Sequence, residues 1–484
     1  MFVVERPASG LFYLKVVFRA GAAHEAPAKA GISHLLEHLL FKSKGAELQR
    51  ELLELGGKSN AYTDLEHTAY HVHAPAPEYA RVIRVVKRLV AETCMDPDTV
   101  EREKRIVIQE RAFTRNRTEE LYQLMLEDTP YGKSVIGTRE TIDAITPSDL
   151  RRYHRERYLK GGCHVAASCP SEDAEDVAKV LAREFGTAFH TPSRDPLLDH
   201  LKNRDTLTIA VFDTENENVD ETKRKTRKNK EKKAVERMDK PAAQRDLSRC
   251  TLMWAVRVRR DLRDVLLDRF MAFVLFEVGP GSALYERMRA EKQLTYRITG
   301  GHNAYTGGNV LTLNLYSESD ILYVNDVLQN RLSEIRRDGL FSDTSDLSRF
   351  KKAFKASLKT VFATQANTAA DLLLTEVTGC QKTSGCAPVS ERKKKEVARV
   401  EEGEFLRRVT DLVDGIDMKE MKALTSRVLG ASRLVAVFGN NTRRTDREFR
   451  EALRDRMRPD AVSDGLRLRT FLFDDYDAEE VPSS

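Results

Sequence analysis

A chain of 484 residues, 41% of them hydrophobic, is long enough to form roughly two or three globular domains. No stretch approaches the roughly 20 consecutive apolar residues of a transmembrane helix, so we expect no membrane span. The net charge of +5 is smaller than the surplus of one basic run at residues 223–233, so the total charge does not indicate a nucleic-acid partner.

The N-terminus and the cysteines bear on the cellular compartment. The first residues lack the charged and apolar segments of a signal peptide and the arginine- and serine-rich composition of an organelle presequence. The six cysteines are scattered and suggest no disulfide framework, and the spacing of Cys380 and Cys386 fits no common zinc knuckle. We therefore expect reduced thiols and a cytoplasmic location, with the mitochondrial matrix as the alternative.

The first part of the chain alternates between strand and helix patterns. Strands are predicted at residues 11–19, which are β-branched and aromatic, and at residues 60–63 and 68–74, which alternate around a turn. Helical patterns lie between these strands and after them. One of them, at residues 47–55, is ended by the two glycines Gly56 and Gly57. The predicted helices are at residues 33–41, 47–55, 78–92 and 97–113.

The helix predicted at residues 33–41 contains the pattern His-x-x-Glu-His, the inverted form of a zinc-protease motif. His34 and His38 lie one helical turn apart on the same face, where two imidazoles can bind one metal ion. Glu37 lies beside them, where its carboxylate can contact a water on the metal. A histidine pair at this spacing also arises by chance on helix surfaces, so the five residues alone leave both interpretations open.

A third metal ligand is predicted on the helix at residues 97–113. Glu103 and Glu110 are two turns apart and share one face of that helix. Glu110 follows the apolar run 106–108, so its carboxylate is expected to be partly buried, and a buried carboxylate requires a partner such as a cation. The neighbouring charges Glu101 and Arg102 are interpreted as ordinary solvated side chains.

The chain resembles the insulinase/pitrilysin metallopeptidases, most closely the β-subunit group of the mitochondrial processing peptidases. The resemblance extends over nearly the whole chain outside its inserts. It implies an α+β fold of two tandem homologous domains, each a mostly antiparallel sheet packed with helices, which together enclose a cleft. The chain begins inside the family's first hairpin, so we expect either a short first strand or a truncated chain. The matching blocks are residues 31–42, 60–63, 66–70, 103–110, 129–132 and 136–138.

The resemblance also implies roles for individual residues. Glu37 would act as the base, and Glu103 would orient a metal ligand. Arg289 and Tyr296 match in spacing an arginine and a tyrosine that active members direct toward the zinc, to stabilise an oxyanion or anchor substrate. By their pattern alone, these two would be an ordinary helix-terminal arginine and a strand tyrosine. The ligands implied for one Zn²⁺ per chain are His34, His38 and Glu110.

The second half repeats a pattern of the first. Residues 145–168 and 416–439 both have the pattern of a helix followed by a strand, and similar residues in the two segments are separated by one constant number of positions. This is weak evidence for a repeat by itself and agrees with tandem domains. Residues 214–244 contain almost no apolar side chains, so we interpret them as a linker or disordered insert. The glycine turn at 279–285 lacks the Gly-Lys-Ser/Thr ending of a phosphate-binding loop, which excludes that function.

Four segments follow from these patterns. The zinc-bearing domain is predicted at residues 1–213, and a charged linker at 214–247 precedes the homologous second domain. The second domain is predicted at 248–440, with an insert at about 378–402. In this domain, strands are predicted at 250–258 and 309–317. One helix is predicted to end at residue 276, and three others are predicted at 286–291, 321–336 and 345–363. A C-terminal extension, 441–484, ends in an acidic tail that we expect to be flexible.

Peptides are the predicted substrates. The strand at 60–63, with Asn60 and Ala61, is expected to pair with an extended peptide through main-chain hydrogen bonds. Processing peptidases select arginine through two acidic residues on the helix after the third ligand, and this chain has Glu120 at the first position but Leu124 at the second. Arginine preference is therefore open, with a broader oligopeptidase or another processing specificity as the alternatives. The enclosed cleft would admit only unfolded or short peptides.

The resemblance also bears on partners and on competing functions. A chain of two such domains is expected to form a homodimer, or a heterodimer with a related subunit. Core subunits of the respiratory cytochrome complex resemble this family without working sites, so a non-catalytic structural subunit is the main alternative to a zinc endopeptidase. In this chain all ligand positions are present. The basic run at 223–233 could serve nuclear import or nucleic-acid binding, although a solvated linker is the simpler interpretation.

Overall fold

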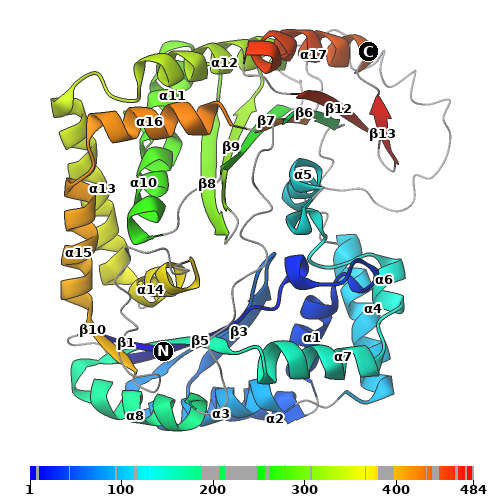
Figure 1. The fold of residues 1–484 in the computed structure, drawn as a ribbon, viewed down its shortest axis with the longest axis vertical. Coiled ribbons are helices and arrows are strands. Elements are labelled where there is room, and N and C mark those ends of the chain that lie inside the picture. Colours follow the sequence, from blue (N-terminus) through cyan, green and yellow to red (C-terminus); the bar gives the residue numbers. More distant parts are fainter. Residues whose placement is uncertain are drawn as a thin grey trace.

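The computed structural model of the chain contains two mixed sheets, each packed with helices (Figure 1). No helix among the residues that it describes is long and apolar enough to cross a membrane. The described residues are 1–6, 10–42, 44–92, 95–113, 117–127, 129–186, 206–212, 248–256, 261–277, 279–305, 308–365, 367–379, 397–431, 433–438, 446–463, 467–474 and 477–481.

Each sheet is a continuous series of hydrogen-bonded strands. In spatial order, the first sheet runs β10 (Ala398–Glu401), β1 (Phe2–Arg6), β5 (Cys163–Pro170), β2 (Leu11–Phe18), β4 (Thr68–Pro75) and β3 (Lys58–Thr63). The second sheet runs β13 (Asp477–Val481), β12 (Arg467–Asp474), β6 (Thr206–Phe212), β11 (Arg433–Phe438), β7 (Ser248–Val256), β9 (Gly308–Ser317) and β8 (Arg297–Tyr305).

The two sheets share one five-strand arrangement. In the first, β1 and β5 are parallel, and β2, β4 and β3 follow in antiparallel pairs. In the second, β6 and β11 are parallel, and β7, β9 and β8 follow in antiparallel pairs. The predicted α+β fold of two tandem domains with mostly antiparallel sheets is therefore confirmed.

This strand order corrects the predicted segment boundaries. Strand β6 falls within the predicted first domain, 1–213, but its parallel pairing with β11 and β12 places it in the second sheet. The predicted linker at 214–247 and its basic run at 223–233 lie outside the described residues, between two strands of that same sheet. The charged segment is therefore an insertion into the second domain.

Two further predicted segments need correction. The insert at about 378–402 is shorter than predicted, because its first residues end helix α14 (Thr368–Gly379) and its last residues form β10 and begin helix α15 (Glu402–Asp414). The extension after residue 440 contains helix α17 (Asp446–Ser463), and its strands β12 and β13 join the second sheet. The acidic segment is thus paired as a strand where a flexible tail was expected.

Most helices predicted from periodicity are present. In the first domain, helices cover the face of the sheet that carries Phe12, Leu14 and Val16. These helices are α1 (Ile32–Leu40), α2 (Lys44–Glu54), α3 (Tyr79–Ala91), α4 (Pro97–Phe113), α6 (Arg139–Asp143), α7 (Pro147–His154) and α8 (Ala174–Phe185). The second domain uses α10 (Leu262–Ala272), α11 (Ala283–Tyr285), α12 (Ile321–Asp338), α13 (Thr344–Thr364), α15, α16 (Met418–Leu429) and α17. Short π-helical turns occupy Arg155–Leu159, Phe273–Glu277 and Glu286–Glu291.

The two domains exchange helices across their boundary. Helix α5 (Arg117–Leu126) belongs to the first half of the chain, yet its Leu121 and Met125 pack with Met253 and Leu434 of the second sheet. In return, α14 lies over β1 and β5 of the first sheet. Figure 1 shows α5 under the second sheet and α14 above the first. Each domain therefore depends on the other to bury one face of its sheet.

Candidate metal centre

Helix α1 carries the His-x-x-Glu-His pattern. Its apolar residues determine which side of the helix faces the core. Ile32, Leu35, Leu36, Leu39 and Leu40 are buried in the core of the first domain. A helix held on these faces has little freedom to rotate. His34 and His38 therefore project together toward α4, against which α1 packs.

The predicted ligands from the two helices converge. The Nε2 atoms of His34 and His38 lie 3.8 Å and 3.4 Å from Oε2 of Glu110. One ligand atom from each of the three residues lies within 4.8 Å of the others. Two ligand atoms at about 2.0–2.1 Å from one tetrahedral ion lie roughly 3.3 Å apart, so the donor set and its spacing fit a zinc ion.

The surroundings keep the first imidazole neutral. Burial lowers the pKa of His34 to about 4, and the neighbouring His38 contributes to the same shift. A neutral imidazole has a free lone pair, which is the form that binds a metal. Glu110 remains 38% exposed at its side chain, so the centre is accessible from one side.

Glu103 stands behind His38. The Glu103 residue is 4% exposed, and its Oε2 lies 3.6 Å from Nδ1 of His38, the ring nitrogen that does not face Glu110. Its other oxygen, Oε1, lies 3.4 Å from Nζ of Lys42. This arrangement can fix the orientation and tautomer of the His38 ring, as carboxylates behind metal-bound histidines do. Lys42 balances part of the buried charge.

Glu37 is held by a hydroxyl from the sheet. Thr63, at the end of edge strand β3, donates a hydrogen bond of 2.6 Å to Oε2 of Glu37. Burial raises the pKa of Glu37 above its ordinary value, while Thr63 and His38 oppose that shift and Glu110 adds to it. A carboxyl group with a raised pKa is better suited to exchange protons near neutral pH than an exposed glutamate.

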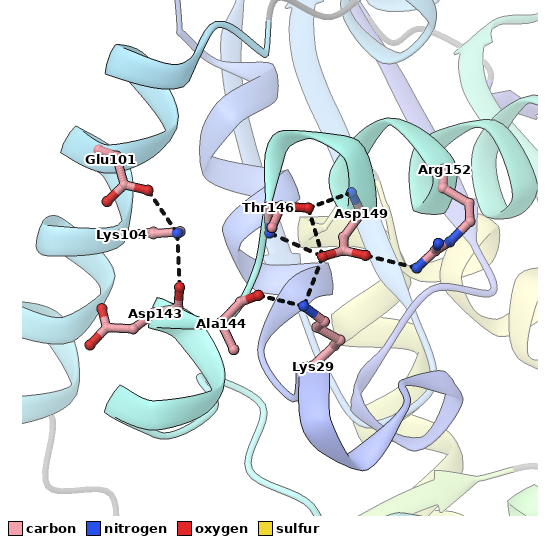
Figure 2. A network of polar contacts seen from close by, with 8 residues as sticks. All are labelled: Lys29, Glu101, Lys104, Asp143, Ala144, Thr146, Asp149 and Arg152. Carbon is pink, nitrogen blue, oxygen red and sulfur yellow. Dashed lines mark hydrogen bonds and ion pairs between the residues drawn. The ribbon is translucent and has the colours of Figure 1, made fainter.

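Polar contacts attach α4 and the segment before α1 to the region between α6 and α7 (Figure 2). On α4, the Lys104 ammonium contacts Glu101 at 2.7 Å and donates to the carbonyl of Asp143 at 3.2 Å. On the loop before α1, Lys29 donates to the carbonyl of Ala144 and lies 2.8 Å from Asp149. Both helices are thereby attached to the turn between α6 and α7.

The residues predicted to bind substrate lie on two elements. β3 is the edge strand of the first sheet, and there the side chain of Asn60 accepts the backbone N–H of Ala61 at 2.9 Å. An incoming strand could replace this contact. Glu120 lies on α5, where Leu124 packs beside the cluster that joins α5 to the second sheet.

The contacts of Arg289 and Tyr296 in the structure are with residues outside the metal centre. Arg289 lies over the ring of Tyr285, 5.3 Å from its centroid, and the Tyr296 residue is 74% exposed. Among the described residues, neither contacts the three ligands or Glu37. Their catalytic role stays a prediction.

Sequence reasoning missed Thr63 and Lys42 as parts of the centre. Strand alternation places Ala61 and Thr63 on the same face of β3, the face toward α1, and this was the available signal for Thr63. Lys42 follows α1 and gives no sequence signal of its contact with Glu103.

The chain matches two models of a single peptidase family. The model described as insulinase, peptidase family M16, matches residues 4–139, and the model described as peptidase M16 inactive domain matches residues 144–353. The uncharacterized zinc protease YmxG of Bacillus subtilis is 23% identical over 349 residues, which are 70% of this chain and 76% of that protein.

Two further comparisons agree with these matches. The β subunit of the mitochondrial-processing peptidase of Saccharomyces cerevisiae is 28% identical over 189 residues, so the match spans 37% of this chain and 40% of the yeast protein. A crystal structure titled peptidase M16 inactive domain, from Pseudomonas fluorescens, has the same fold, with a TM-score of 0.67 and 14% identity over 90% of this chain and 94% of that one.

Proposed function

The chain belongs to the insulinase family of peptidases, family M16, and we propose that it is a zinc-dependent endopeptidase acting on unfolded or short peptides. The observation that carries this proposal is the convergence of His34, His38 and Glu110 from two separate helices. Helix packing alone does not require two imidazoles and a carboxylate at one point.

In the proposed mechanism, these three residues hold one Zn²⁺. When bound, the ion supplies Lewis-acid chemistry, because it lowers the pKa of water and polarises a peptide carbonyl. Glu37 accepts the proton of the attacking water and returns it to the leaving amide nitrogen. Thr63 keeps the carboxylate of Glu37 in place through this exchange, and Glu103 keeps the ring of His38 in place.

The proposed substrate lies along β3. Strand β3 has one paired edge, toward β4, and in the described part of the chain nothing pairs with its other edge. An extended peptide could add there as a further strand, displacing the side chain of Asn60 from the N–H of Ala61. Glu120 is proposed to bind a basic side chain of the peptide, and without an acid at Leu124 that preference would be weak.

The competing proposal is a non-catalytic subunit of a larger complex. The label "inactive domain" belongs to the model that matches residues 144–353, the part of the chain without the His-x-x-Glu-His pattern. In the described part of the chain, neither Arg289 nor Tyr296 has a contact with the three ligands or Glu37, which favours this alternative. We also propose that two chains, or this chain and a related subunit, assemble as a dimer in the cytoplasm or, alternatively, the mitochondrial matrix.

The proposal is tested with the purified full chain, alone, on a library of internally quenched peptides. Cleavage is expected for unfolded peptides, with loss of activity after treatment with a chelator and recovery on adding Zn²⁺. Glu37→Gln is expected to lower kcat by about 10²–10⁴ while zinc stays bound. Light scattering of the same sample measures the oligomeric state.

Two results would reject the peptidase. Activity that survives complete zinc removal would exclude the metal mechanism, and an unchanged kcat in Glu37→Gln would exclude the proposed base. A chain that binds zinc but cleaves no peptide, alone or with a related subunit, would support the non-catalytic alternative.

A further inference from the structure

Helix α1 starts at a residue that cannot cap it. Gly31 occupies the position before the first helical residue with φ of 91°, a left-handed conformation that favours glycine. A Cβ atom at this position would lie 2.4 Å from the carbonyl oxygen of Ile136 and 2.6 Å from Cδ1 of Ile142. The serine, threonine or aspartate that usually caps a helix is therefore sterically excluded at this position.

A carboxylate from elsewhere in the chain takes over this function. Oε2 of Glu25 accepts the N–H of Gly31 at 2.7 Å, and Oε1 accepts the N–H of Ser33 at 2.8 Å. Glu25 is only 4% exposed, and Lys133 donates to its backbone carbonyl. Burial raises the pKa of Glu25, while the hydrogen bonds from Ser33 and Gly31 and the charge of Lys133 act in the opposite direction. Because each carboxylate oxygen accepts an N–H, the anionic form is the one that satisfies both contacts.

The position of this carboxylate matters for a metal ion. The N-terminus of a helix carries a partial positive charge of roughly half an elementary charge, concentrated in the first turn. His34 lies in this first turn, one residue after Ser33. A divalent cation bound to His34 would therefore lie near an unfavourable potential, and a buried negative charge on the same turn offsets it.

We propose that Glu25 is a positioning residue for the zinc ion: its buried carboxylate fixes the first turn of α1 and offsets the positive end of that helix. The inference rests on the proposed zinc binding. It assigns to Glu25 an effect on metal affinity, which an ordinary helix cap would not have. It also explains why a charged side chain is buried next to the first turn of α1, the turn that carries His34.

The test compares zinc affinity with stability of the metal-free protein. Glu25→Gln keeps the size of the side chain and one oxygen acceptor, but removes the charge. Asp320→Asn is the matched control, because Asp320 caps α12 through the N–H groups of Leu322 and Tyr323, far along the chain from the ligands. Zinc affinity is measured by competition with a chromogenic chelator, and the Tm of the metal-free protein by calorimetry.

Glu25→Gln is expected to weaken zinc binding by about tenfold or more. Asp320→Asn, which keeps an oxygen that can cap α12, is expected to leave zinc affinity unchanged. Equal affinity in Glu25→Gln and wild type would overturn the role of Glu25 and leave the peptidase proposal intact. A wild-type chain without zinc affinity would overturn both. Glu25→Asp retains the charge and serves if the glutamine variant does not fold: it is expected to keep affinity within a few-fold of wild type, and a loss of tenfold or more would overturn the proposal.

Discussion

Thr63 shows what a single hydroxyl contributes to the proposed chemistry. A carboxylate that exchanges protons in a half-buried site must be held in one orientation, and free rotation of Glu37 would separate it from its substrate. The hydroxyl of Thr63 restrains one oxygen of Glu37 at 2.6 Å and leaves the other oxygen available. Thr63 itself contacts the hydroxyl of Thr68, so the restraint extends into the sheet.

Replacing Thr63 by valine tests this contribution. Thr63→Val preserves the shape of the side chain and removes only the hydroxyl, so we expect kcat to fall roughly tenfold, the cost of one hydrogen bond to a charged group. Zinc content should stay at the wild-type level, because Thr63 contacts no ligand. A variant with wild-type kcat would show that Glu37 needs no such restraint.

Asp264 illustrates a carboxylate that destabilises the fold. One oxygen of Asp264, in the first turn of α10, is buried without a hydrogen-bond partner among the described residues. Burial raises its pKa to about 7, and the nearby carboxylates of Asp261 and Asp268 add to the shift. Because the folded-state pKa is above the ordinary value of 3.8, ionisation costs stability as the pH rises from about 4 to about 7.

Asp264→Asn should therefore stabilise the protein in a pH-dependent way. Above pH 7 we expect a gain of about 1–2 kcal/mol in unfolding free energy, less than the full shift implies because the group is only partly buried. Near pH 4 the two proteins should be equally stable. Denaturant unfolding of both proteins across this range measures the effect, and a gain that does not vary with pH would contradict the assignment.

At the scale of elements, the centre depends on the relative placement of α1 and α4. The two helices meet through their ligands and through the turn between α6 and α7, where the carbonyls of Asp143 and Ala144 accept Lys104 and Lys29 (Figure 2). Thr146 caps α7 by accepting the backbone N–H of Asp149. The Asp149 carboxylate accepts the N–H of Thr146 in return and pairs with Lys29 and Arg152. A shift of this turn would change the distance between the histidines and Glu110.

Lys104→Met removes the link from α4 while keeping the aliphatic volume. We expect a loss of about 1–2 kcal/mol in stability, because the carbonyl of Asp143 loses its buried donor, and a several-fold weaker zinc affinity. Lys179→Met on α8 is the control, since Lys179 pairs with Glu175 and Asp176 but is exposed and lies on a helix that carries no ligand. If Lys104→Met lowers Tm but leaves zinc affinity unchanged, the contacts of Lys104 do not influence the metal centre.

Periodicity and spacing predicted the local part of the centre. The leucines of α1 and the four-residue spacing of His34 and His38 define one helical face, and the seven-residue spacing of Glu103 and Glu110 defines another. The same rules could not predict Thr63 or Glu25 as their partners, because those contacts join elements through tertiary packing. The predicted boundary at residue 213 puts β6 in the wrong domain for the same reason. The charged segment after β6 has the composition of a linker, and only the pairing of β6 with β11 shows that the strand belongs to the second sheet.

At the scale of the whole molecule, the exchange of α5 and α14 makes the two domains interdependent. On the first sheet, Asp371 of α14 accepts Lys15 at 2.7 Å and is also bound by Asn367. On the second sheet, Tyr122 of α5 accepts a hydrogen bond of 2.6 Å from Asn303 of β8. Sequence patterns show that such helices have apolar faces, but not that the faces belong to the neighbouring domain.

The pair of Lys15 and Asp371 provides a measure of this coupling. We expect Asp371→Asn to lower the unfolding free energy by about 1–2 kcal/mol, because it leaves a largely buried ammonium without its charge partner. Combining it with Lys15→Met should cost less than the sum of the two single changes. Strictly additive losses in the double-mutant cycle would show that the contact between Lys15 and Asp371 adds no coupling energy between the domains.

The most direct test of the proposed centre is the zinc content of the purified full chain after loading and dialysis. Wild type and Glu37→Gln are both expected to hold about one zinc ion per chain, since Glu37 is not a ligand. His34→Ala and Glu110→Gln, which act from different helices, are each expected to hold nearly none. A wild-type chain that retains no zinc, or full zinc retention in either ligand variant, would contradict the centre on which the proposed function is built.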